Sequence, residues 1–190
     1  MMERTSKFLS LSGWAGILAG VYALAGAYIA YKVFDFNPDE IIYTPSGSLT
    51  SALWKVILLA AIILILALGT AIFLSSQKAA KRGEKLWNPT TRMVVINMAV
   101  PLVTGGLLSL ILISKGMNGL LAPVTLLFYG LAIFNVSKFT FEEVQTLGLI
   151  QIALGLISSY FIGYGLLFWV IGFGVVHILY GIFLHYKYER

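Results

Sequence analysis

Six blocks of about twenty apolar residues dominate the sequence, and their length constrains the fold more than any other feature. A helix of about twenty residues crosses the ~30 Å hydrocarbon core of a bilayer, whereas a soluble domain of this size cannot bury six such blocks. The composition, 59% hydrophobic and 11% charged, agrees with lipid as the solvent. We expect transmembrane helices at residues 12–34, 53–75, 93–114, 120–136, 144–163 and 165–186. The predicted fold is an all-α polytopic integral membrane protein, with residues 1–190 in a single transmembrane domain.

The basic residues between the blocks predict the orientation of the chain. Six alternating spans place ten Lys and Arg residues on one side of the membrane and three on the other. The larger set is Arg4, Lys7, Lys78, Lys81, Arg82, Lys85, Arg92, Lys138, Lys187 and Arg190, and the smaller set is Lys32, Lys55 and Lys115. Because loops rich in Lys and Arg stay in the cytoplasm, we expect both termini on that side. The first apolar run is too long for a signal peptide, so we expect it to be the first span.

The connection at residues 78–92 carries five basic residues against one acidic residue. Its first expected role is to set the topology. Its second is attraction to anionic lipid headgroups, at about 1 kcal/mol per basic residue. The expected headgroup contacts are Lys78, Lys81, Arg82, Lys85 and Arg92. Since a net charge of +5 is explained by such loops, we expect the lipid bilayer as the partner and no nucleic acid.

The third and fourth blocks resemble the fifth and sixth. Residues 96–104 align with residues 150–158. Both segments carry, in the same order, an amide side chain, an alanine, a residue that disfavours a helix (proline or glycine) and a hydroxyl side chain. Tyr-Gly-Leu-Ala-Ile-Phe at residues 129–134 likewise resembles Tyr-Gly-Ile-Phe at residues 180–183. The first two blocks carry a fainter third copy of this pattern. The sequence therefore leaves a two-fold and a three-fold hairpin repeat equally open. The predicted arrangement is three antiparallel hairpins with an internal hairpin repeat.

Three tandem hairpins in a chain of this length, with Gly-Ile-Phe at residues 181–183, resemble the HdeD-like family of small six-helix membrane proteins associated with acid resistance. The acidic loop at residues 35–52 and the basic loop at residues 78–92 have no counterpart in that pattern. The resemblance implies a stress-response protein, and we expect it in a bacterial inner membrane. It carries no catalytic motif over to this chain.

Small residues at helical spacing predict faces on which helices pack closely in lipid. They are Gly16, Gly20 and Ala23 on the first span, Gly155, Ser159 and Gly163 on the fifth, and Gly174, His177 and Gly181 on the sixth. We expect these faces to be buried between helices. They are also the surfaces through which a homo-oligomer is expected to form.

No Asp, Glu, Lys or Arg lies in the middle of any predicted span, which leaves few polar groups there. At ~1.5 Å per residue, His177 and Gln151 lie at the same depth, about 13 Å from the inner surface. With Asn97 and Asn135 they form a predicted polar cluster that faces the cytoplasm. One interpretation is a site that binds a ligand or senses pH through His177. The other is a set of structural hydrogen bonds between helices, worth about 0.6 to 2 kcal/mol each.

The small number of polar residues within the predicted spans favours a function without catalysis. The chain has no cysteine, its two histidines are eight residues apart and no carboxylate shares their depth, so we expect no metal, cofactor or catalytic residue. The first hypothesis is a non-enzymatic sensor, stress-response or accessory membrane protein. The second is a channel or carrier for a small neutral or weakly acidic solute, which needs no embedded charge. The third is a membrane enzyme that modifies lipid with His177 as acid or base.

Overall fold

The computed structural model describes residues 13–36, 51–81, 83, 85–140 and 142–188. Most of these residues are helical, and none of them is in a strand. The long helices are α1 (Gly13–Val33), α2 (Ser51–Lys81), α3 (Pro89–Ser114), α4 (Leu121–Val136) and α5 (Glu142–Tyr160). The last span, here called the sixth helix, consists of α6 (Gly165–Trp169), the π-helix η5 (Val170–Val176) and α7 (His177–Tyr188). Short 3-10 turns are η2 (Asn118–Leu120), η3 (Ser137–Phe139) and η4 (Ile162–Tyr164).

Each predicted block coincides with a helix, and five helical segments of the described chain are long and apolar enough to cross a membrane. These are Gly13–Val33, Leu53–Lys81, Pro89–Ser114, Asn118–Phe139 and Ile162–Tyr188. Helix α5 is not among them, although it occupies the fifth predicted block. Its first turn carries Glu142 and Glu143, and Gln145 and Gln151 follow, which lowers its hydropathy.

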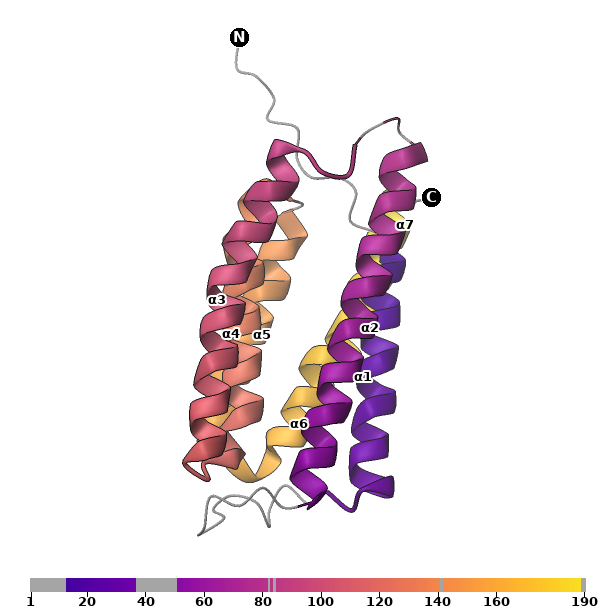
Figure 1. The fold of residues 1–190 in the computed structure, drawn as a ribbon. Coiled ribbons are helices and arrows are strands. Elements are labelled where there is room, and N and C mark those ends of the chain that lie inside the picture. The colour runs from indigo at the N-terminus through magenta and orange to yellow at the C-terminus, as the bar shows by residue number, and fades with distance from the viewer. Residues whose placement is uncertain (1–12, 37–50, 82, 84, 141, 189–190) are drawn as a thin grey trace.

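The helices form two groups that are joined by the sixth helix (Figure 1). In one group α3 and α5 pack against α4, and in the other α2 packs against α1. The sixth helix begins beside the first group, where α6 contacts α4 and α5, and continues along α1 through η5 and α7. The closest neighbour of α5 is therefore α4, and that of the sixth helix is α1. This differs from the predicted tight hairpin between the last two spans.

Glycines explain why the sixth helix lies so close to α1. A Cβ atom at Gly20 would lie 2.6 Å from the carbonyl oxygen of Gly174, and one at Gly181 would lie 2.6 Å from the carbonyl oxygen of Gly13. A Cβ at Gly16 would lie 3.2 Å from the Cα of Gly181. The small faces predicted on the first and sixth spans thus meet each other within one chain.

A second pair of glycines brings α4 and α5 together. A Cβ atom at Gly130 would lie 2.8 Å from the carbonyl oxygen of Gly148, and one at Gly148 would lie 2.8 Å from the backbone nitrogen of Phe134. Contact between backbones is how helices pack when lipid supplies no hydrophobic drive for association. This pair was not among the predicted packing faces, since the two glycines stand alone in their own helices without a small residue at the next turn.

The buried face of α5 is correspondingly rotated from the predicted one. The prediction placed Gly155, Ser159 and Gly163 on it, but Ser159 is half-buried and donates its hydroxyl to the Gly155 carbonyl at 2.9 Å. Gly163 lies beyond the helix, in η4. The face that α5 buries consists of Val144, Leu147, Gly148, Gln151, Gly155 and Ser158.

An apolar core joins the first group to α7 at the end where α4 finishes and α5 begins. It draws on α3, α4, α5 and α7 and consists of Val94, Ile133, Val136, Val144, Leu147 and Leu184. Tyr129 and Tyr180 are partly buried hydrophobic side chains that pack against it. The sixth helix is thereby held to the first group by large side chains and to the second by close backbone contact.

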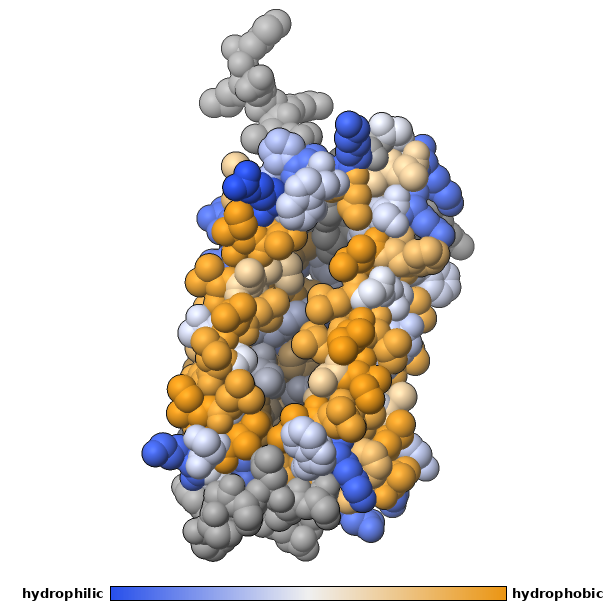
Figure 2. All heavy atoms as spheres, in the orientation of Figure 1, coloured by the Kyte–Doolittle hydropathy of each residue, from blue (hydrophilic) through white to orange (hydrophobic). Residues whose placement is uncertain are grey.

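The outer surface carries a band of apolar side chains between two polar ends (Figure 2). Helices α2 and α3 contribute much of it; Ile65 is 69% exposed and Val100 is 66% exposed. A soluble protein does not leave contiguous apolar surface of this extent in water. The band is typical of a surface in contact with lipid tails.

The two polar ends differ in charge. The starts of α1, α3 and α5 and the ends of α2, α4 and α7 lie together at one end of the bundle (Figure 1). Within the described residues this basic end carries Lys78, Lys81, Lys85, Arg92, Lys138 and Lys187, and the opposite end carries Lys32, Lys55 and Lys115. The other members of the predicted basic set, Arg4, Lys7, Arg82 and Arg190, lie outside the described residues.

Candidate functional site

His177 lies where the sixth helix changes from a π-helix to an α-helix. The π-helix η5 ends at Val176, and His177 is the first residue of α7. A π-helical segment is rare and often marks a functional position, because its wider turn changes the direction of side chains and carbonyls. Here Gly172 within η5 accepts hydrogen bonds from two side chains.

Both ring nitrogens of His177 have partners, and these partners assign its tautomer. The Nδ1 atom lies 2.8 Å from the carbonyl oxygen of Gly172, which can only accept, so Nδ1 carries the proton and donates. The Nε2 atom lies 2.7 Å from the Tyr129 hydroxyl on α4, which donates to it when the ring is neutral. His177 thus links α4 to the π-helical turn, and its exposed fraction is 5%.

Gln151 contributes a third helix to this arrangement. Its Nε2 atom donates to the Gly172 carbonyl at 2.8 Å and lies 3.4 Å from His177 Nδ1. The side chain has 0% exposure, and its Oε1 atom has no hydrogen-bond partner among the described residues. The Gly172 carbonyl thus accepts from both α5 and α7. We call Tyr129, Gln151, Gly172 and His177 the His177 junction.

Aromatic rings cover one side of the His177 junction. The Phe173 ring is stacked on the imidazole with centroids 5.9 Å apart, and the Tyr129 ring lies 4.9 Å from Phe173. Trp169 follows on the same side of the sixth helix, 5.0 Å from Phe173. An imidazole that gains a proton here would face the π-electrons of Phe173, which attract a cation.

The structure brings together two of the four residues in the predicted polar cluster. Gln151 and His177 are in contact, whereas Asn97 donates to the carbonyl of Met93 in its own helix at 2.8 Å. That bond lies in the stretch where Pro101 removes the backbone donor for the Asn97 carbonyl, so Asn97 belongs to a locally weakened part of α3. Asn135 is exposed and lines a surface hollow at the basic end.

Sequence reasoning missed two members of the His177 junction, Tyr129 and Gly172. Tyr129, in the middle of the predicted span at residues 120–136, served only as a marker of the internal repeat. Gly172 acts through its backbone carbonyl, and a residue type does not indicate which carbonyl will accept side-chain hydrogen bonds. Their signal in the sequence is weak: the run Gly172-Phe173-Gly174 lies one turn before His177 and loosens that part of the helix.

The predicted headgroup contacts lie at the end of α2, in the connection that follows it and in the first turn of α3. Lys81, Lys85 and Arg92 are exposed and Lys78 is half-buried, whereas Arg82 lies outside the described residues. Asn88 caps α3 by accepting from the backbone N–H of Thr91 at 2.8 Å, and Pro89 starts the helix. The cap fixes where this basic segment turns back toward the bundle.

At the basic end, one ion pair joins α5 to the end of the sixth helix. Lys187 donates to Glu143, and the Tyr188 hydroxyl lies 3.0 and 3.1 Å from the two Glu143 carboxylate oxygens. Partial burial raises the pKa of Glu143, but the hydrogen bonds from Lys187 and Tyr188 and the Lys187 charge outweigh it and lower the pKa below 4.5. This contribution to stability is present above pH 4.5 and is lost as the pH falls through the lowered pKa. Because the pair is exposed, the effect is small.

The group at the His177 junction that can exchange a proton is the imidazole. Among the described residues, no three His, Cys, Asp or Glu side chains lie close enough to hold a metal ion. The groups within hydrogen-bond distance of His177 are a phenol, an amide and a backbone carbonyl. Comparisons of the chain with protein families, with curated proteins and with solved structures gave no match.

Proposed function

We propose that the chain is a multi-pass membrane protein with both termini in the cytoplasm, and that it acts as a non-enzymatic sensor in a stress response. The proton is the signal and His177 is the group that receives it. The observation that carries the proposal is the pair of opposite hydrogen-bond roles at the two ring nitrogens of His177. The layout of three tandem hairpins predicted from the sequence, which resembles that of HdeD-like proteins, supports the same class of function.

Protonation changes one of these two roles and leaves the other intact. An imidazolium donates from both nitrogens, so Nδ1 keeps its bond to Gly172 while Nε2 no longer accepts from Tyr129. The Tyr129 hydroxyl must then rotate and accept, and its own proton needs a new acceptor. Tyr129 is on α4 and His177 on the sixth helix, so the contact between the two helix groups depends on the charge of one ring.

Among the described residues, no carboxylate forms a hydrogen bond with His177. Tyr129 faces its ring from α4, Gln151 from α5, and the Gly172 carbonyl from its own helix. A histidine ordinarily changes charge between about pH 5 and 8, in the range of cytoplasmic stress. Since nothing nearby holds the ring permanently charged, the neutral form is the resting state and the charged form is the signal.

Burial favours a sensor over a carrier or an enzyme. His177 is 5% exposed and Gln151 is 0% exposed, so a solute or lipid substrate has no direct access to either side chain. A proton needs no open cavity, because it moves along hydrogen bonds. The junction therefore suits a response to pH better than turnover of a molecule.

Acidification is expected to change the fluorescence of Trp169 in a way that depends on His177. Trp169 stacks on Phe173, which stacks on His177, so a shift of this aromatic row alters its environment. The measurement uses lipid nanodiscs and a Trp14→Phe, Trp54→Phe, Trp87→Phe background, which also removes the contact of Trp14 with His185. We expect a single sigmoidal change as the pH is lowered from about 8.

The matched control is the second histidine. The transition should disappear in His177→Gln, which cannot titrate, and remain in His185→Gln. A transition that survives His177→Gln, or a flat response in the parent protein, contradicts the proposal.

A further inference from the structure

The hydroxyl of Tyr180 is a buried polar group that the His177 junction does not use in its neutral state. Tyr180 lies on α7, three residues after His177, and its side chain packs against the same apolar core as that of Tyr129. Its hydroxyl oxygen is buried and has no hydrogen-bond partner among the described residues. A buried polar atom without a partner is rare in native proteins and calls for a physical reason.

The charged state of the His177 junction has the opposite defect, a donor without an acceptor. Once Nε2 of His177 is protonated it donates to the Tyr129 oxygen, so the Tyr129 hydrogen needs another acceptor. The amide of Gln151 lies 3.4 Å from Nδ1 and therefore on the other side of the imidazole from Tyr129. The Tyr180 oxygen is the acceptor that remains, on the helix that carries His177.

The electrostatic surroundings of Tyr180 favour a role as acceptor. Tyr180 interacts electrostatically with Tyr129 on α4, with Glu143 on α5 and with Tyr188 on its own helix. The Glu143 carboxylate attracts hydrogens, and it already accepts from Lys187 and Tyr188. It therefore favours the orientation in which the Tyr180 hydrogen points toward the basic end, which leaves the oxygen lone pairs for a donor on α4.

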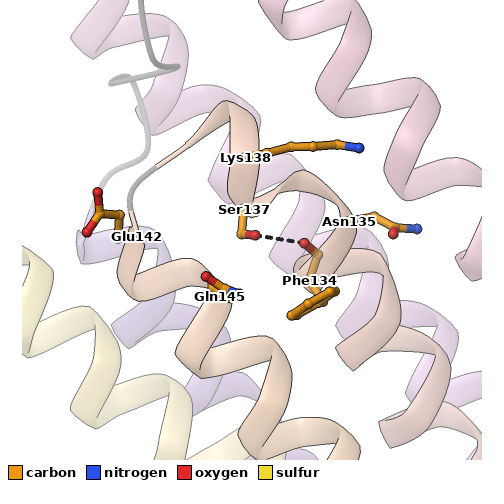
Figure 3. A pocket seen from close by; sticks show the side chains of 6 residues that line it. All are labelled: Phe134, Asn135, Ser137, Lys138, Glu142 and Gln145. Atoms are coloured by element: carbon orange, nitrogen blue, oxygen red, sulfur yellow. Dashed lines mark hydrogen bonds between the residues drawn. The ribbon is translucent and has the colours of Figure 1, made fainter.

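The other groups near this part of α7 are apolar or lie at the surface. Helix α3 contributes Val94 to the apolar core, and α1 places Ile17 against α7. Lys138 and Glu142 line a surface hollow at the basic end, where their charged groups point away from each other (Figure 3). Among the described residues, Glu143 is thus the carboxylate that acts on the Tyr180 hydroxyl.

From these positions we propose that Tyr180 is the acceptor for the Tyr129 hydroxyl when His177 is charged. The arriving proton binds Nε2, Nε2 donates to the Tyr129 oxygen, and the Tyr129 hydrogen turns to the Tyr180 oxygen; neither O–H bond breaks. Because the two hydroxyls are not hydrogen-bonded in the neutral state, this step draws α4 and α7 together. The inference rests on the proposed sensing role of His177, and it makes Tyr180 the positioning residue that converts the charge into a helix movement.

Tyr180→Phe tests this role, with the acid titration of His177 as the readout. The titration is followed by the imidazole nitrogen-15 signals of His177 in lipid nanodiscs. The variant should lower the midpoint by about one pH unit, or about tenfold in proton affinity, because the charged state loses an acceptor and the neutral state loses no bond. Unfolding in SDS at about pH 8 should show no loss of stability, since phenylalanine fills the same space.

Tyr186→Phe is the matched control, because it removes an exposed hydroxyl from the same helix, and it should leave the midpoint unchanged. In a Tyr129→Phe background, Tyr180→Phe should cause no further shift, since no phenol hydrogen is left to accept. An unchanged midpoint in Tyr180→Phe, or an equal shift with and without the Tyr129 hydroxyl, overturns the role of Tyr180. A His177 that does not titrate in the parent protein instead overturns the sensing role itself, so the two failures are distinguishable.

Discussion

Replacement of Gly148 by alanine is expected to lower the free energy of unfolding by about 1 to 3 kcal/mol. The new methyl group would lie 2.8 Å from the backbone nitrogen of Phe134 and 2.9 Å from the carbonyl oxygen of Gly130. Both atoms belong to the backbone of α4, so no flexible side chain can move aside, and the helices must separate. Separation of α4 from α5 weakens contacts along their whole length. Unfolding by SDS titration in mixed micelles measures the loss.

Gly106→Ala provides the control for the intrinsic effect of alanine in a helix. Gly106 lies within α3, and a Cβ atom there has no neighbour within 4 Å. Alanine is favoured over glycine in helices by about 0.8 to 1.0 kcal/mol, so Gly106→Ala should leave stability unchanged or raise it. Equal effects of the two substitutions would show that α4 and α5 are not in backbone contact at Gly148.

The second large effect is expected from the bond between His177 and Tyr129. His177→Leu leaves the buried Tyr129 hydroxyl without its acceptor, at a cost of about 1 to 3 kcal/mol. The Gly172 carbonyl keeps its bond from Gln151, so it adds little to this cost. Tyr129→Phe removes the donor and leaves Nε2 without a partner, at a cost of about 0.6 to 2 kcal/mol.

The double variant distinguishes this bond from general packing. Once both partners are apolar, no buried polar group is left unpaired, so His177→Leu with Tyr129→Phe should cost less than the sum of the single changes by about 1 kcal/mol. The comparison is made at about pH 8, where histidine is ordinarily neutral. Costs that simply add would mean that the two side chains do not share a hydrogen bond.

The helices were largely predictable because apolar blocks of spanning length permit few alternatives. The predicted span at residues 120–136 becomes α4 at Leu121–Val136, and the span at residues 12–34 becomes α1 at Gly13–Val33. The neighbours of each helix were less predictable. A short connection fixes only that two helices are antiparallel, whereas glycine contacts decide which pair lies closest. Gly16 and Gly20 were found from their spacing, but Gly130 and Gly148 have no such pattern.

The candidate site was predictable only in part. The shared depth of Gln151 and His177 follows from counting residues along two helices, and the structure places these two side chains in contact. Asn97 lies at a similar depth, but depth does not determine which way a residue faces around the helix axis. The role of Gly172 could not be predicted from the sequence, because it depends on a π-helical turn that residue types do not encode.

Self-association remains a prediction from the sequence. The structure reduces the number of small-residue faces that are exposed for it. Gly16, Gly20, Gly174 and Gly181 contact each other inside one chain. By contrast, Gly69 on α2 and Gly106 on α3 have open space where a Cβ would lie. We therefore expect a second copy to pack against these outer helices, whose exposed side chains are otherwise suited to lipid.

The central claim is that His177 rests as a neutral imidazole with its proton on Nδ1 and gains a second proton on acidification. The chain has two histidines, so selective nitrogen-15 labelling gives two imidazole signals, and His185→Gln assigns them. In nanodiscs at about pH 8, the account predicts a protonated Nδ1 and an Nε2 that accepts a hydrogen bond, converting to imidazolium on acidification. A neutral ring with its proton on Nε2, or a His177 signal that is unchanged on acidification, would contradict it.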